Sequence, residues 1–98
     1  MWYPYDDGKT ISTKGSEEGV IILDEEFSNE ARITLEKDGW TPYAITCGIY
    51  GMMAHTAFAS TETEAVEKYS SMKKEIQDFC EGSGDSSDWC CQFTGKYH

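Results

Sequence analysis

The chain has 98 residues, 18 of them acidic and 8 basic, which gives a net charge of −10. This length predicts one domain that can bury a modest core without disulfides. No apolar run of about 18 residues occurs, so no transmembrane helix is expected. The excess of acids disfavours binding to nucleic acid or to an anionic membrane surface.

Residues 1–18 are expected to form a polar leader that lacks the basic start and apolar stretch of a signal peptide. On that basis the expected compartment is the cytoplasm, where thiols stay reduced. Trp2, Tyr3 and Tyr5 lie close together in the leader. This spacing indicates that the start of the chain docks, either on its own sheet or on a second copy of the protein.

Two strands are predicted next. Residues 19–24 contain a continuous β-branched run, typical of a strand that is apolar on both faces. Residues 30–37 alternate apolar and polar side chains, which is typical of a half-buried strand. The connections are expected at residues 25–29 and, with Asp-Gly turn chemistry, at residues 38–42.

A hairpin is predicted around Tyr50 and Gly51, with these two residues as its turn. That turn places Ile49 opposite Met52, Cys47 opposite Ala54, Ile45 opposite Thr56 and Tyr43 opposite Phe58 on one apolar face. The other face then receives smaller or polar residues, including Thr46, Met53 and His55. A shift of one residue would exchange the two faces.

One amphipathic helix follows the hairpin. Thr61 and Glu64 have the spacing of a capping box. Apolar residues then recur at helical spacing and form a single stripe, which comprises Ala65, Tyr69, Met72, Ile76 and Phe79. The helix is expected to end near Cys80, because Gly and Ser follow.

Together these elements predict an α+β fold, a four-stranded antiparallel β-meander with one C-terminal amphipathic helix on its apolar face. In this two-layer sandwich, Ile21 and Leu23 lie beside Ile33 and Ala31, and Ile33 and Leu35 lie beside Cys47 and Ile45. Residues 1–98 form a single domain with its core at residues 19–80. Residues 81–98 form a linker, at residues 82–88, and a C-terminal segment, in which residues 89–93 either add a fifth strand or pack on the mixed sheet face. Val20, Ile22 and Met53 on that face are expected to be covered by a tail of this chain or by another molecule.

A candidate binding site lies on that mixed face. The predicted register brings together His55, Thr46, Arg32 and Thr34. A histidine beside hydroxyls and an arginine can bind an anionic ligand or act in acid–base chemistry. The simpler interpretation is a half-exposed histidine on a sheet face, and no nucleophile or acid stands at catalytic spacing.

A candidate docking surface is acidic. Asp24, Glu25, Glu26 and Glu30 form a stretch without an intervening base, and Trp40 is an aromatic outside the predicted core. Such a surface suits a basic partner protein. The simpler interpretation is a set of solvated loops.

The four cysteines lack the paired spacing of a zinc site. Cys47 is expected in the core and Cys80 at the helix end, while Cys90 and Cys91 are adjacent and would point to opposite faces of a strand. Buried small hydrophobic residues are the favoured interpretation. A disulfide, a redox pair or a metal site involving Cys80, Cys90 and Cys91 is left open.

No catalytic, nucleotide-binding or calcium-binding motif is present. We therefore expect no enzyme activity, no metal and no cofactor, and a function in protein–protein interaction as an inhibitor or regulatory subunit, with a basic protein or a second copy as partner. In size, charge and layout the chain is similar to small acidic inhibitor and immunity proteins, although no motif carries the similarity. The alternative is a domain that binds a small anionic ligand on the His55, Thr46 and Arg32 face.

Overall fold

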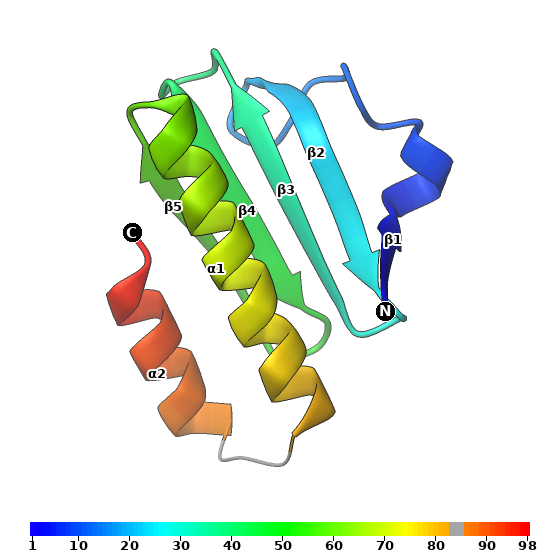
Figure 1. Cartoon of the computed structure of the whole chain (residues 1–98), viewed down its shortest axis with the longest axis vertical. Coiled ribbons are helices and arrows are strands. Elements are labelled where there is room, and N and C mark those ends of the chain that lie inside the picture. Colours follow the sequence, from blue (N-terminus) through cyan, green and yellow to red (C-terminus); the bar gives the residue numbers. More distant parts are fainter. Residues whose placement is uncertain (83–85) are drawn as a thin grey trace.

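The computed structural model describes residues 1–82 and 86–98 and has an α+β fold (Figure 1). Its antiparallel sheet has the strand order β1-β2-β3-β4-β5, and both helices lie on one face of it. The strands are β1 (Trp2–Pro4), β2 (Val20–Phe27), β3 (Ala31–Lys37), β4 (Tyr43–Ile49) and β5 (Met53–Ala59). The helices are α1 (Glu62–Glu81) and α2 (Ser86–Lys96), and a short 3-10 segment, η1 (Tyr5–Gly8), follows β1.

The α+β class is confirmed, but the prediction of four strands and one helix omitted β1 and α2. We call the sheet face under the helices the helix face and the opposite one the open face. Within the described residues, neither helix combines the length and the apolar character that crossing a membrane requires.

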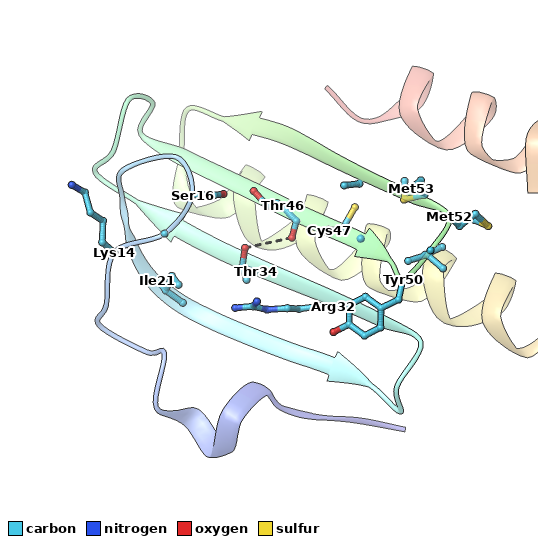
Figure 2. Close-up of a pocket in the computed structure, with 15 residues that line it drawn as sticks. Lys14, Ser16, Ile21, Arg32, Thr34, Thr46, Cys47, Tyr50, Met52 and Met53 are labelled. Carbon is cyan, nitrogen blue, oxygen red and sulfur yellow. Dashed lines mark hydrogen bonds between the residues drawn. The ribbon is translucent and has the colours of Figure 1, made fainter.

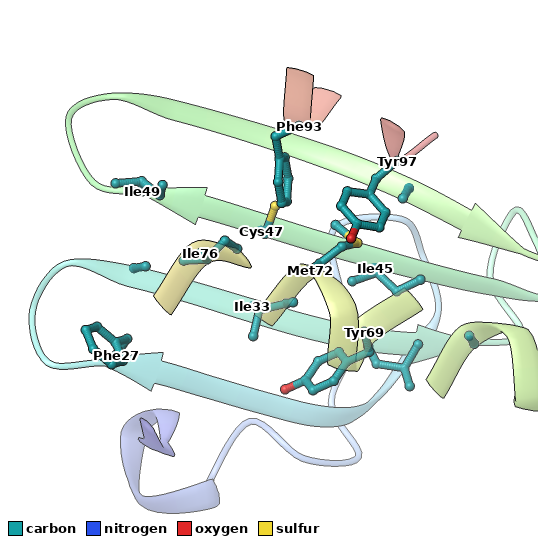
Figure 3. Close-up of a cluster of buried hydrophobic side chains, with 14 of the residues drawn as sticks. Phe27, Ile33, Ile45, Cys47, Ile49, Tyr69, Met72, Ile76, Phe93 and Tyr97 are labelled. Atoms are coloured by element: carbon teal, nitrogen blue, oxygen red, sulfur yellow. The ribbon is translucent and has the colours of Figure 1, made fainter. Parts of the chain in front are cut away.

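The centre of the core follows the predicted pattern. Ile33 pairs with Cys47 and Leu35 pairs with Ile45, as expected. These side chains are buried against the stripe of α1, in which Ala65, Tyr69, Met72 and Ile76 are all buried (Figure 3). Burial of these apolar surfaces is the main force that holds α1 on the sheet.

The start of α1 is capped as the sequence indicated. The Oγ1 atom of Thr61 accepts a hydrogen bond from the Glu64 N–H at 3.2 Å. The Glu64 Oε1 atom accepts from the N–H of Ser60, at 3.0 Å, rather than from Thr61 itself. The two bonds satisfy donors that a helix start otherwise leaves without partners.

The predicted register of the β4–β5 hairpin is wrong by one residue on β5. The loop has three residues, so Ile49 pairs with Met53, Cys47 with His55 and Ile45 with Ala57. Gly51 has φ +75° and the Met52 N–H donates to the Ile49 carbonyl at 2.9 Å. A two-residue loop at Tyr50 and Gly51 would require positive φ at Tyr50. That backbone conformation is strained for a bulky residue.

The predicted register of β2 against β3 is also wrong. Strand β2 continues to Phe27, which pairs with Ala31, and a bulge between Ile21 and Leu23 shifts the pairing. The acids at the end of β2 are compatible with a strand because each has a partner. Asp24 binds Arg32, Glu25 binds Tyr69 and Lys73, and Glu26 binds Tyr50.

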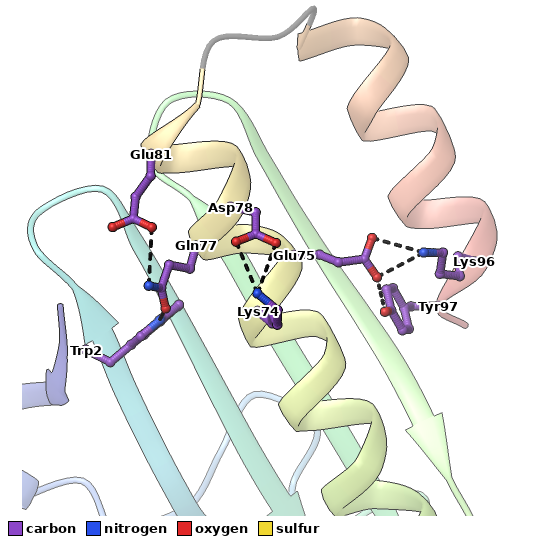
Figure 4. A network of polar contacts seen from close by, with 8 residues as sticks. All are labelled: Trp2, Lys74, Glu75, Gln77, Asp78, Glu81, Lys96 and Tyr97. Atoms are coloured by element: carbon purple, nitrogen blue, oxygen red, sulfur yellow. Dashed lines mark hydrogen bonds and ion pairs between the residues drawn. The ribbon is translucent and has the colours of Figure 1, made fainter.

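The start of the chain supplies the fifth strand. Trp2 pairs with Phe27 across β1 and β2, and its ring lies 5.3 Å from the Phe27 ring. The indole N–H of Trp2 donates to Gln77 on α1 at 3.0 Å (Figure 4). The expected docking of the aromatic leader on its own sheet therefore occurs through β1.

The C-terminal segment is a helix on the helix face, not a strand and not a cover for the open face. Trp89, Phe93 and Tyr97 recur every four residues and form a row of ring contacts that begins at Phe79 of α1. Glu75 of α1 accepts from Lys96 at 3.0 Å and from the Tyr97 hydroxyl (Figure 4). The linker predicted at residues 82–88 falls partly on residues 83–85, outside the described residues.

The residues expected to need a cover also lie elsewhere. Ile22 and Met53 pack against the core cluster of the helix face, and Val20 is 42% exposed. They therefore do not form one apolar patch on the open face.

We predict that Phe93→Ala lowers the free energy of unfolding by about 3–4 kcal/mol, because Phe93 is fully buried between two rings and His55. Urea unfolding followed by far-UV circular dichroism measures the change. Gln92→Ala, at the exposed neighbouring position, serves as the control and is expected to change stability little. Equal stability of the two variants would show that α2 contributes no core packing.

Candidate functional site

The open face of β3, β4 and β5 carries three cross-strand rows of side chains. The rows are Arg32–Gly48–Ala54, Thr34–Thr46–Thr56 and Glu36–Ala44–Phe58. The Thr46 and Thr56 hydroxyls lie 3.2 Å apart. Strands β4 and β5 contain no Asp, Glu, Lys or Arg, so the part of the open face over these two strands is uncharged.

Residues 5–19 lie over the β2–β3 part of the open face. The Tyr5 ring stacks on the Arg32 guanidinium, whose Cζ is 3.6 Å from the ring centroid. The Thr10 hydroxyl donates to Asp24 at 2.7 Å. This covering segment therefore divides the open face into a covered part over β2–β3 and an uncovered part over β4–β5.

The ion pair of Asp24 and Arg32 lies beneath the covering segment. Arg32 Nε and Nη2 donate to the two Asp24 oxygens at 2.9 and 2.7 Å, in bidentate geometry. Asp24 is only 2% exposed. Hydrogen bonding to Asp24 raises the pKa of Arg32, so the guanidinium keeps its charge. The pair fixes the position of the Arg32 head group.

Glu36 holds the loop that ends the covering segment. It is 1% exposed, and its Oε1 atom accepts from the N–H groups of Glu17 and Gly19 at 3.0 and 2.9 Å. Gly15 lies directly on the carboxylate, because a Cβ there would come within 2.2 Å of Oε2. The buried Glu36 side chain thus anchors the loop, and residue 15 cannot carry a larger side chain.

A groove of about 610 Å³ lies beside the covering segment on the open face (Figure 2). Arg32, Thr34, Thr46 and Tyr50 line it around Gly48, and Ala54 lines it from β5. Met52 and Met53 line its hairpin end. The volume falls in the range of ligand-binding clefts.

The groove contains three of the four residues predicted to form an anionic-ligand site. Arg32, Thr34 and Thr46 line it, but His55 does not. The three-residue hairpin loop places His55 on the helix face, where it contacts the Phe93 ring and its Nε2 atom bonds the Tyr97 carbonyl. The predicted constellation is therefore wrong in its histidine.

The predicted acidic docking residues do not form one surface. Asp24 is buried, and Glu25 and Glu26 bind side chains of their own chain. Glu30 and Trp40 are exposed, with Trp40 at 77%, but they lie in the turns at opposite ends of β3.

All four cysteines are free thiols. Cys47 is buried in the core as expected, and burial raises its pKa to about 12. Burial also raises the pKa of Cys80, with a further contribution from Glu30 and Glu81. Within residues 1–82 and 86–98, no three His, Cys, Asp or Glu side chains gather as metal ligands would.

Comparison with protein-family models, with curated proteins and with solved structures finds no match for this chain. The function of the site therefore has to be inferred from its own residues. Sequence reasoning missed Gly48, Tyr50 and Met52 as groove residues. The signal for Gly48 was a glycine inside a strand, which often marks close approach of another molecule.

We predict that Glu36→Ala lowers the free energy of unfolding by about 2 kcal/mol, because the N–H groups of Glu17 and Gly19 lose their acceptor. Amide hydrogen exchange should then speed up at these two residues. Glu36→Gln keeps the Oε1 acceptor and should preserve most of their protection, while Lys37→Ala is the exposed control. Unchanged exchange in Glu36→Ala would show that the loop is held elsewhere.

We predict that iodoacetamide at pH 8 labels the exposed Cys91 first and leaves Cys47 unmodified until urea unfolds the protein. Because burial raises the folded-state pKa of Cys47 from 9.0 to about 12, the unfolded state loses this proton first as the pH rises. The stabilisation from this group is present below pH 9.0 and is lost between pH 9.0 and about 12. Mass spectrometry of labelled peptides reports the order, and early labelling of Cys47 would contradict it.

Proposed function

We propose that the protein is a non-catalytic binding module that recognises a basic partner protein through the uncovered part of its open face. The observation that carries the proposal is the uncharged surface over β4 and β5 in a chain of net charge −10. Depletion of charge at the centre and polar groups at the rim are typical of protein interfaces.

The rim of this surface supports a basic partner. Residues 5–19, which lie beside it on the open face, contain four acids and two bases. Asp6 and Asp7 are exposed in η1, which packs on β2, while Glu18 forms an ion pair at 3.0 Å with Lys14, a residue that lines the groove. Complementary charge at a rim speeds association and orients the partner more than it adds affinity.

Exposed aromatic and polar side chains support binding at the centre. Phe58 is 39% exposed and Tyr50 is 47% exposed, and both lie at the uncovered surface. Aromatic side chains supply large contact areas in interfaces. The threonine row between them offers hydroxyls for hydrogen bonds without introducing charge.

We predict that Thr56→Lys weakens binding of the partner at least tenfold, or about 1.4 kcal/mol, because it places a charge at the centre of the surface. Wild type, Thr56→Lys and Ser70→Lys are immobilised and used to capture proteins from a lysate of the source cells. Ser70 is exposed on α1, so its variant adds the same charge away from the open face.

The expected result is a basic protein retained by wild type and Ser70→Lys and lost with Thr56→Lys, whose purified complex weakens as salt is added. Urea unfolding verifies that both variants fold. Capture of the same proteins by Thr56→Lys and wild type would contradict the proposal. Self-association of wild type that Thr56→Lys abolishes, measured by sedimentation, would replace the basic partner with a second copy.

A further inference from the structure

Neither the backbone conformation nor the packing of the fold requires a glycine at residue 48. It lies in the middle of β4, and its φ is outside the left-handed region. A Cβ at residue 48 would find Met53 O as its nearest neighbour, at 3.4 Å, which is close to ordinary contact. A glycine weakens a strand, and where the fold does not need it, close approach of another molecule explains its presence.

Gly48 forms the floor of the groove, between Arg32 on β3 and Ala54 on β5. The absence of a side chain at residue 48 and the small one at residue 54 leave the space open. Ile21 and Ala54 line the groove as apolar residues, while Met52 and Met53, which pack against the core cluster, border its hairpin end. The floor and the walls thus suit an apolar occupant.

The charges around the groove favour an occupant without net charge. Arg32 is neutralised by Asp24, and Lys14 is neutralised by Glu18. A free anion is repelled by the net charge of −10, whereas a cation finds two bases and no acid among the described residues that line the groove. A neutral apolar group meets neither cost.

Arg32 has hydrogen-bond donors that its ion pair with Asp24 does not use. Arg32 uses Nε and Nη2 to bind Asp24, and Nη1 lies on the side of the guanidinium away from that carboxylate. Among the residues that the structure describes, no acceptor bonds to Nη1. Because Tyr5 and Asp24 hold the guanidinium in place, a carbonyl oxygen can accept from Nη1 without rearrangement of the site.

We infer that the groove over Gly48 receives one large apolar side chain of the partner protein, whose neighbouring main-chain carbonyl accepts a hydrogen bond from Arg32 Nη1. The volume of about 610 Å³ accommodates such a side chain with its flanking peptide groups. This inference rests on the proposed function and adds the chemistry that the partner must present.

The test uses capped amino acids as neutral probes of the groove. N-acetyl-L-tryptophanamide and N-acetyl-L-leucinamide are titrated into ¹⁵N-labelled protein, with N-acetylglycinamide and sodium octanoate as comparison ligands. Saturable chemical-shift changes are expected for the first two probes at Thr46, Gly48 and Ala54, and none for N-acetylglycinamide. Octanoate binding without binding of the capped amides would overturn the inference in favour of a small amphipathic anion.

Gly48→Val fills the groove with a residue that favours strands, and should weaken binding of both capped amides at least tenfold. Gly95→Ala is the matched control, because it adds a methyl group in open space on α2 and should bind them like wild type. Ala54→Leu fills the groove from the exposed side and provides the same test if Gly48→Val fails to fold. Unchanged probe binding in a folded groove-filling variant would overturn the inference.

The same variants separate this inference from the proposed function. A partner that Thr56→Lys loses but Gly48→Val retains would leave the proposed function standing and overturn the inserted side chain. Capped amides that bind wild type and are lost in Gly48→Val support the groove chemistry even where the capture experiment identifies no partner.

Discussion

The register between β4 and β5 is the constraint on which the rest of the structure depends. A turn with positive φ at Gly51 but not at Tyr50 makes the loop three residues long. Every side chain of β5 is thereby assigned to a face, because side chains alternate along a strand. His55 faces Phe93 of α2 on the helix face, and Thr56 extends the threonine row of the open face. One backbone dihedral angle therefore decides both the core and the candidate interface.

Pairing of charges decides which surfaces are left for a partner. The Asp24–Arg32 pair and the buried carboxylate of Glu36 hold residues 5–19 over β2 and β3. Asp24, which the sequence indicated as part of a docking surface, instead positions the covering segment through Thr10. The uncharged surface over β4 and β5 stays uncovered beside it, with the groove at their boundary. The proposed interface stays uncovered because Asp24 and Glu36 hold the covering segment over β2 and β3 instead.

Sequence patterns predicted the elements whose signals are local. The capping residue Thr61 and the stripe of α1 were sufficient for that helix, and alternation was sufficient for β3. The helix α2 was missed because residues 89–93 were considered as a strand or as a cover for the open face, and the spacing of four from Trp89 to Phe93 and Tyr97 was not recognised as a helical stripe. Strand β1 was missed because three residues carry no periodicity, and its stability comes from Phe27 and Gln77.

The sequence by itself determined the α+β class, the apolar stripe of α1, the pairing of β3 with β4 and the absence of charge from β4 and β5. These properties depend on residue type and on spacing within an element, and both are given directly by the sequence. Only the tertiary structure decided that His55 leaves the site, that Asp24 and Glu36 are buried anchors, and that Gly48 is the floor of a groove. Each of these depends on which distant residues meet, and that is set by turn geometry and by the β2 bulge, where one residue more or less exchanges the two faces of a strand.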